Sequence, residues 1–148
     1  METVRSVSFD LFNTLITVER GALTDALNRL LDQLRQGGFS FNSTAFQDDH
    51  RQAALEKLEK ARKDGKETHN SIWISAALMK QGYSVFPSDP RIASAVEGYF
   101  SAFLDHARVI PGTREMLGRL QGRYRLGLLS NFTHAPAARS ILDHLGLT

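Results

Sequence analysis

The sequence predicts an α/β fold in which two parallel strands are separated along the chain by a long helical insert. The first strand is expected at residues 4–10, where apolar Val7 and Phe9 alternate with serines, a pattern typical of a strand. The second is expected at residues 125–130, a short apolar run that ends in small polar residues, as a buried parallel strand does. Between them, helical periodicity runs from residue 22 to about residue 106.

Composition excludes several classes of protein. The chain has 148 residues, 42% of them hydrophobic and 23% charged, which is the balance of a soluble globular domain. A formal charge of +2 without a tight basic run argues against nucleic-acid binding. The absence of cysteine excludes disulfides, thiolate nucleophiles and cysteine-based zinc sites. We find no apolar stretch long enough for a membrane span and no signal-peptide pattern, so we expect a cytoplasmic protein that does not bind membranes.

The insert reads as four helices that form a bundle. A polar break at residues 17–21 precedes it, and glycines or capping residues bound each helix. The predicted helices cover residues 22–36, about 44–63, about 70–81 and 90–106. After a break at 109–112, a short helix at 113–121, the second strand and a helix at 136–145 follow.

Two polar residues end the predicted strands. Asp10 ends the first and Ser130 the second. Open α/β sheets place their ligand groups at the carboxyl ends of parallel strands, so both side chains are expected at one edge. Two strands are too few for an independent sheet, which usually needs three or more. The sheet in this chain is therefore expected to be incomplete. His134, shortly after Ser130, is expected in a surface loop.

These residues resemble the motifs of the haloacid dehalogenase superfamily. The first motif, a strand ending in Asp-x-x-x-Thr, corresponds to Asp10–Thr14, and the second, a strand ending in Ser or Thr, corresponds to residues 126–130. The step Pro111-Gly112 before an amphipathic helix is also similar. The resemblance implies a Rossmann-like parallel sheet formed by residues 1–16 and 108–148, with a four-helix cap at 17–107.

The resemblance also implies roles for individual residues. Asp10 would be the nucleophile that forms a covalent aspartyl intermediate. Thr14, Ser130 and Asn131 would contact a small anionic substrate, and Asn131 is similar to the asparagine of the dehalogenase branch. In the phosphatase branch, Asp10 and the backbone carbonyl of Phe12 would bind Mg²⁺.

One departure from the family pattern concerns leaving-group chemistry. Phosphatases of this family usually carry a second Asp two residues after the nucleophile as general acid, and this chain has Phe12 there. Phenylalanine cannot donate a proton, and the dehalogenase branch commonly has an aromatic residue at this position. The resemblance thus implies hydrolysis of a 2-haloacid without a cofactor, or of a phosphate ester with Mg²⁺ and another acid.

The second departure concerns the end of the sequence. The family's third motif is a lysine downstream of Ser130 and its fourth is an acidic pair, yet all lysines of this chain lie between residues 57 and 80, and the only acid after Ser130 is Asp143. We therefore expect a truncated member that is inactive or nearly so by itself. The alternative is a non-catalytic protein that persists by self-association, as a homo-oligomer or by element exchange, because a two-stranded sheet leaves an unpaired edge. A helical interaction module is a third interpretation, and it leaves Asp10 and Ser130 unexplained.

Overall fold

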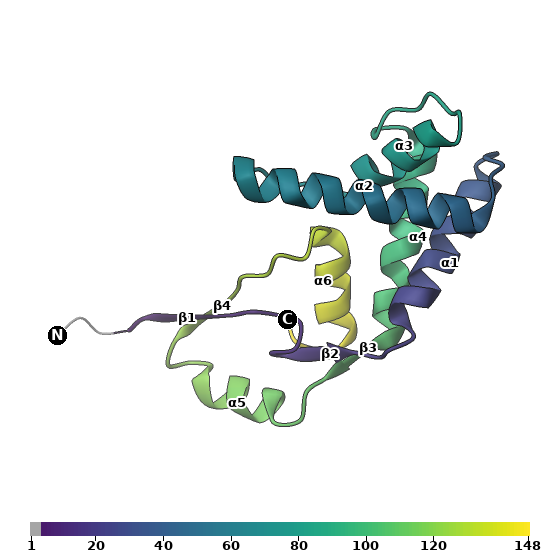
Figure 1. The fold of residues 1–148 in the computed structure, drawn as a ribbon. Coiled ribbons are helices and arrows are strands. Elements are labelled where there is room, and N and C mark those ends of the chain that lie inside the picture. The colour runs from purple at the N-terminus through teal and green to yellow at the C-terminus, as the bar shows by residue number, and fades with distance from the viewer. Residues whose placement is uncertain (1–3) are drawn as a thin grey trace. The chain divides into compact units, whose positions relative to one another are not determined.

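A computed structural model describes residues 4–148 of the chain. Two strands precede four consecutive helices, and two further strands alternate with two helices in the last part of the chain (Figure 1). They are β1 (Ser6–Phe9), β2 (Ile16–Val18), α1 (Ala22–Gln36), α2 (Ser43–Asp64), α3 (Asn70–Lys80), α4 (Pro90–His106), β3 (Ala107–Val109), α5 (Thr113–Leu120), β4 (Arg125–Leu128) and α6 (Ala135–His144). The predicted α/β class with inserted helices is confirmed, and each predicted helix is present within two residues of its expected bounds.

Two compact units make up the chain. The described residues up to Ala22 form one unit together with Phe103–Thr148, and Leu23–Ala102 form the other. We call the first the core unit and the second the helical unit. The core unit contains all four strands with α5 and α6, whereas the helical unit contains α2, α3 and most of α1 and α4.

The core unit contains the predicted parallel strand pair. β1 pairs with β4 in a register that places Ser6 beside Arg125 and Phe9 beside Leu128. The backbone N–H of Leu129 donates to the carbonyl oxygen of Phe9 over 2.8 Å, so the pairing continues to the residue before Asp10. The expectation of two parallel strands from distant parts of the sequence is therefore confirmed.

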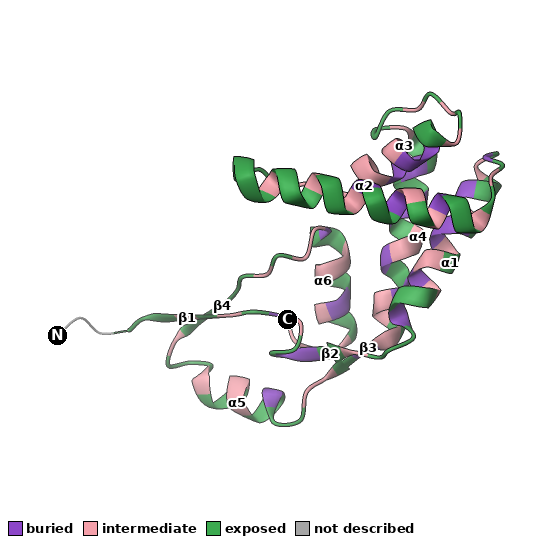
Figure 2. Ribbon diagram, in the orientation of Figure 1, coloured by how far each residue is buried: buried purple, intermediate pink, exposed green. Residues whose placement is uncertain are grey.

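The predicted burial of the second strand is wrong. All four residues of β4 are exposed (Figure 2), and the exposed fractions of Leu126 and Leu128 are 37% and 39%. A parallel strand becomes buried only when elements cover both of its faces and strands flank both of its edges. Within the described residues, β4 pairs with β1 alone.

A second, antiparallel strand pair lies in the core unit and was not expected. Residues 16–18 of β2 pair with residues 107–109 of β3, where the sequence predicts a polar break and the end of a helix. Three-residue strands are too short to show alternation. Each strand is defined by its hydrogen bonds to the other, which lies far away in the sequence. Such long-range pairing leaves no pattern in the neighbouring residues from which it could be predicted.

A small apolar cluster holds the core unit together. The side chains of Leu11, Leu15 and Ile16, which follow Asp10, are buried against Ala107 and Ile141. Around them pack half-buried side chains of the strands, α4, α5 and α6, among them Phe9, Phe12, Phe103, Leu104, Met116, Leu117, Ala138, Leu142, Leu145 and Leu147. The turn after β1 is thus anchored by the most buried residues of this unit.

The helical unit has its own core and the predicted caps. Asn42 Oδ1 accepts a hydrogen bond from the N–H of Ala45 over 3.0 Å, and Asp89 Oδ1 accepts one from the N–H of Arg91 over 2.9 Å. Hydrogen bonds from the Arg91 guanidinium and, to a smaller extent, from the Arg91 backbone N–H lower the pKa of Asp89 to about 2. Fifteen apolar residues are buried here, from Ala26 in α1 to Ala102 in α4. None of the helices that the structure describes is both long enough and apolar enough to cross a membrane.

A buried polar pair lies inside the helical unit. His50 of α2 and Asn70 of α3 approach to 2.8 Å between Nε2 and Oδ1. Because an amide oxygen only accepts, the histidine nitrogen is the donor. Burial lowers the pKa of His50 below its usual value, against a smaller opposite effect of the hydrogen bond to Asn70.

Candidate active site at the ends of β1 and β4

Asp10 lies directly after β1, on a tight turn. The carbonyl oxygen of Leu11 accepts hydrogen bonds from the N–H groups of Leu15 (2.9 Å) and Ile16 (3.1 Å). Asn13 has a left-handed backbone with φ of 60°, a conformation that asparagine tolerates better than most residues. The buried Leu11 and the turn together leave the Asp10 carboxylate exposed to solvent at the strand end.

Thr14 lies on the same turn and faces the acid. Its hydroxyl donates a long hydrogen bond of 3.5 Å from Oγ1 to Oδ2 of Asp10. The first and last residues of the Asp-x-x-x-Thr motif are thus in contact. The tight turn brings residues four positions apart together, which explains the spacing of the motif. A nucleophilic carboxylate in this position would be oriented by the threonine and remain open to a substrate.

Ser130 and Asn131 follow β4 at the same end of the strand pair as Asp10, as the parallel register requires. Ser130 is half-buried and Asn131 is exposed. The Ser130 Oγ accepts a hydrogen bond of 3.3 Å from the N–H of Phe132. The predicted grouping of both motifs at one sheet edge is present in the structure.

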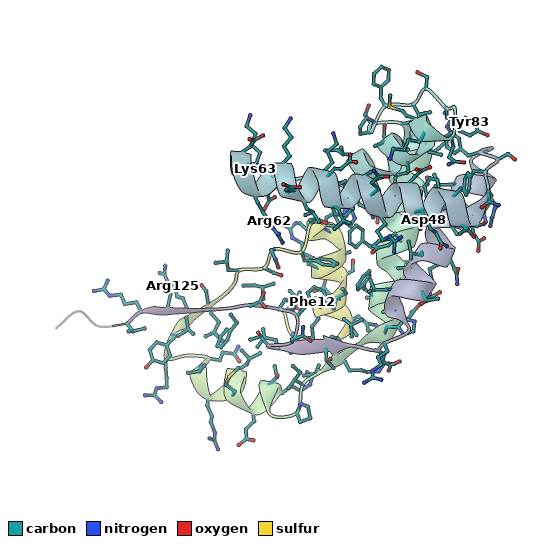
Figure 3. The ribbon with its side chains drawn as sticks, viewed as in Figure 1. Phe12, Asp48, Arg62, Lys63, Tyr83 and Arg125 are labelled. Atoms are coloured by element: carbon teal, nitrogen blue, oxygen red, sulfur yellow. The ribbon has the colours of Figure 1, made fainter. Side chains whose placement is uncertain are left out.

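Three phenylalanine rings meet beside this edge. The ring of Phe12 lies 4.8 Å from that of Phe132 and 6.4 Å from that of Phe103, and Phe103 and Phe132 are 5.7 Å apart between centroids. Phe12 is labelled where the turn follows β1 (Figure 3). These tilted and edge-on contacts are the preferred aromatic geometry. We call these three side chains the phenylalanine cluster.

Sequence reasoning missed Phe103 and Phe132 as neighbours of the site. Phe132 follows Ser130 by two residues, as Phe12 follows Asp10 by two, and that symmetry was an available signal. The expectation of a surface loop for His134 is wrong, because this residue is 8% exposed and precedes α6 at its N-cap position. The apolar residues of α6 bring the start of that helix into the core unit.

The turn after β1 supplies only some of the ligands that the predicted magnesium site would need. Asp10 supplies one exposed carboxylate, and Phe12 supplies a backbone carbonyl on the same turn. No group of three or more histidine or acidic side chains gathers anywhere in residues 4–148. A magnesium ion usually needs one or two carboxylates with water and substrate oxygens. The described side chains do not complete a metal centre, so we derive no catalytic step through magnesium.

One solved structure shares the fold of this chain with a TM-score above 0.5, and two others match with lower scores. The putative HAD-hydrolase YfnB from Bacillus subtilis, whose structure has magnesium bound, matches with 19% identity and a TM-score of 0.54 over 99% of this chain and 60% of that chain. A dehalogenase matches with 17% identity and a TM-score of 0.44 over 99% and 59% of the two chains. The defluorinating L-2-haloacid dehalogenase Rha0230 gives 19% identity and a TM-score of 0.47 over 97% and 57%. This chain therefore spans about 60% of the length of the structures that it matches.

Sequence comparison identifies the family. No curated protein matches the sequence. The family model of the haloacid dehalogenase-like hydrolases, by contrast, matches residues 4–148, which includes both motifs and the helices between them. The chain belongs to the haloacid dehalogenase-like hydrolase family.

Proposed function

We propose that this protein is a hydrolase in which the Asp10 carboxylate attacks a small anionic substrate. Family membership supports the class of reaction. The exposed position of Asp10 at the end of β1, with Thr14 Oγ1 at 3.5 Å, supports the role of nucleophile. Ser130 and Asn131, at the same sheet edge, would hold the oxygens of the substrate by hydrogen bonds.

Among substrates of this family, a 2-haloacid fits the site best. The observation that carries this choice is the phenylalanine cluster. Its member Phe12 stands two residues after Asp10, where phosphatases of this family usually have the general acid for the leaving group. An alkoxide leaving group needs a proton, whereas a halide leaves without one. Ring edges carry partial positive charge, so an aromatic surface is compatible with a departing halide.

The proposed reaction has two steps. An Asp10 carboxylate oxygen attacks the carbon that bears the halogen, a carbon–oxygen bond forms, and the halide leaves with the electrons of the carbon–halogen bond. Water then attacks the carbonyl carbon of the aspartyl ester, which releases a 2-hydroxyacid, one proton and the regenerated carboxylate.

A phosphate ester is the second candidate substrate. The magnesium bound to the Bacillus subtilis neighbour supports it, because phosphoryl transfer through an aspartate uses a divalent cation to offset charge. In that case Asp10 and the carbonyl of Phe12 would contribute to the metal site, and an acid other than residue 12 would protonate the leaving group.

Turnover by this chain is expected to be slow. No lysine follows Ser130, and an attacking carboxylate next to an anionic substrate gains much of its transition-state stabilisation from a nearby cation. The assay should therefore measure product at the stoichiometry of the protein. The non-catalytic alternative predicts no product at all.

The experiment incubates the full chain with 2-bromopropionate or with p-nitrophenyl phosphate, each with magnesium or with EDTA. Free halide, free phosphate and the intact mass of the protein are followed over hours. We expect bromide release that is indifferent to EDTA, and a transient mass increase located on the peptide that contains Asp10. Asp10→Asn should abolish both signals, while Glu115→Gln, which removes an exposed carboxylate of α5, should leave them unchanged.

Each other outcome has a defined meaning. Bromide release that survives Asp10→Asn would exclude this residue as nucleophile. Phosphate release that needs magnesium, without bromide release, would replace the haloacid by the phosphate ester. No product from either substrate would exclude catalysis by this chain and favour the non-catalytic alternative.

A further inference from the structure

The core unit has a groove, lined by apolar residues together with polar ones such as Arg114 and Gln121, that the proposed active site does not use. It has a volume of about 620 Å³ and lies between the strand pair, α5 and the segment that ends the chain. Its lining includes Phe9, Leu117, Leu126, Leu128, Leu142 and Leu147. Asp10, Thr14, Ser130 and Asn131 are not among the residues that line it.

One face of the strand pair forms a wall of this groove. The register places Val7 beside Leu126 and Phe9 beside Leu128, and paired residues of neighbouring strands project from the same face. Ser6, Ser8 and Arg125 belong to the other face. The groove face is therefore apolar, and its leucines are more than one-third exposed.

β4 also has an unpartnered edge. Within the part of the chain that the structure describes, its backbone pairs with β1 on one side only. Free N–H and C=O groups on a strand edge favour the addition of another strand. An exposed apolar face next to a free edge is unusual for a strand that remains alone.

We propose that the edge of β4 binds β4 of a second copy of this chain, antiparallel and around a two-fold axis at Gly127. In this arrangement Leu126 lies opposite Leu128 of the second copy, and Arg125 lies opposite its Leu129. The sequence Arg-Leu-Gly-Leu-Leu thus pairs with itself without placing like charges opposite each other.

Several observations favour a second copy as the occupant. A two-fold interface needs the same surface on both partners, and the leucines at 126 and 128 flank Gly127 symmetrically. In the proposed dimer the two Arg125 side chains would lie at opposite ends of the paired strands, since each Arg125 begins its own β4. Pairing also converts two marginal two-stranded sheets into one sheet of four strands, within the usual range of stable sheets.

The four leucines of the two copies would then form one apolar patch continuous with both grooves. Leu126 and Leu128 of each copy project from the groove face, and antiparallel partners directly opposite each other share a face. Burial of this patch supplies the driving force, while the backbone hydrogen bonds of the edge set the register.

The test measures the mass of the full chain in solution by light scattering and sedimentation over micromolar concentrations. We expect a dimer, with about twice the 16.5 kDa of the single chain. Leu126→Lys and Leu128→Glu should each weaken dimerisation at least tenfold, because each puts a charge into the apolar patch. Leu55→Lys is the matched control, since Leu55 is an exposed leucine of α2, and it should leave the dimer unchanged.

The register gives a sharper test. A mixture of the Leu126→Lys and Leu128→Glu chains places lysine opposite glutamate in the mixed dimer and leaves leucine opposite leucine at the other pair. We expect the mixture to regain dimerisation that neither variant has alone. Unchanged helical circular dichroism would show that the variants are folded.

Three results would overturn the proposal. One is a monomer at every concentration. Another is a dimer that both charged variants retain, as exchange of whole elements between copies would produce. The third is loss of dimerisation in both variants without recovery in the mixture, which would place the interface elsewhere or in another register.

Discussion

The hydroxyl of Thr113 donates a hydrogen bond of 3.1 Å to the carbonyl oxygen of Leu15, although the two residues are 98 positions apart in the sequence. The same oxygen accepts a second hydrogen bond of 3.0 Å from the N–H of Ile110. Thr113 is the first residue of α5, Ile110 lies in the segment between β3 and α5, and Leu15 belongs to the turn after Asp10. The first motif is thus tied to the segment that leads into the second.

Removal of this hydroxyl should destabilise the core unit. Thr113 is buried, so Thr113→Val keeps the shape of the side chain and loses the donor to Leu15. We expect the free energy of unfolding to fall by about 1–2 kcal/mol, the usual cost of a lost buried hydrogen bond. Urea denaturation of the two proteins measures it. Thr113→Ser retains the donor and should lose less, and equal losses in both variants would contradict the assigned role.

The left-handed backbone of Asn13 predicts an unusual order of substitutions. Asn13→Gly should be tolerated or slightly stabilising, because glycine adopts a φ of 60° without strain. Asn13→Ala should destabilise the chain by about 1 kcal/mol. Thermal unfolding of both variants distinguishes them. An alanine variant as stable as the glycine variant would mean that the turn relaxes to another conformation.

A change at Phe12 should shift the preference between substrates. Phe12→Asp places a proton donor two residues after Asp10, so we expect the ratio of phosphate release to bromide release to rise by about a hundredfold or more, the usual size of a general acid's contribution. Phe12→Leu keeps the position apolar and serves as control. If both variants change the ratio equally, the effect comes from loss of the phenylalanine cluster and not from the new acid.

The buried His50 predicts a pH-dependent stability of the helical unit. Burial holds the pKa of His50 below its usual value of 6.5, so the unfolded chain takes up a proton there more readily than the folded one. The free energy of unfolding should be unaffected by this group above about pH 6.5 and fall as the pH decreases below it, until the pKa of the folded state is reached. The loss amounts to about 1.4 kcal/mol for each unit between the two pKa values.

The variant His50→Gln isolates this contribution. Its side-chain amide can still donate to Asn70 but does not titrate. As the pH falls from about 7.5 to about 5.5, the histidine protein should lose free energy of unfolding through this group, whereas the glutamine variant should not. Any stability advantage of the histidine protein at the higher pH should therefore shrink or reverse at the lower one. A difference that stays constant with pH would exclude His50 as the titrating group.

Local sequence patterns predicted the helices well because apolar periods, capping residues and terminating glycines are all features of short stretches of sequence. The Asn42 cap and the apolar stripe of α1 are properties of a few neighbouring residues. The ends of β1 and β4 were also predictable, since Asp10 follows a stretch of alternating apolar and polar residues and Ser130 follows an apolar run. The grouping of the two motifs then follows from parallel pairing alone.

Other features depend on partners far away in the sequence. The phenylalanine cluster joins the turn after β1, the end of α4 and the segment after β4, and no local pattern contains that information. The exposure of β4 was missed for a related reason. An apolar strand has the same sequence whether or not neighbouring elements cover it, because burial is a property of the assembly.

The unexpected pair of β2 and β3 joins the two ends of the segment that contains the helical unit. The N–H of Glu19 donates to the carbonyl oxygen of His106 over 3.1 Å just beyond this pair, so the chain leaves the core unit and returns to it through adjacent positions. Topologically, the whole helical unit is the loop of a hairpin. A loop whose two ends already meet can be lengthened, shortened or exchanged without stretching the fold from which it emerges. The neck formed by β2 and β3 therefore makes the helical unit a module that can be resized or exchanged while the residues of the core unit stay the same.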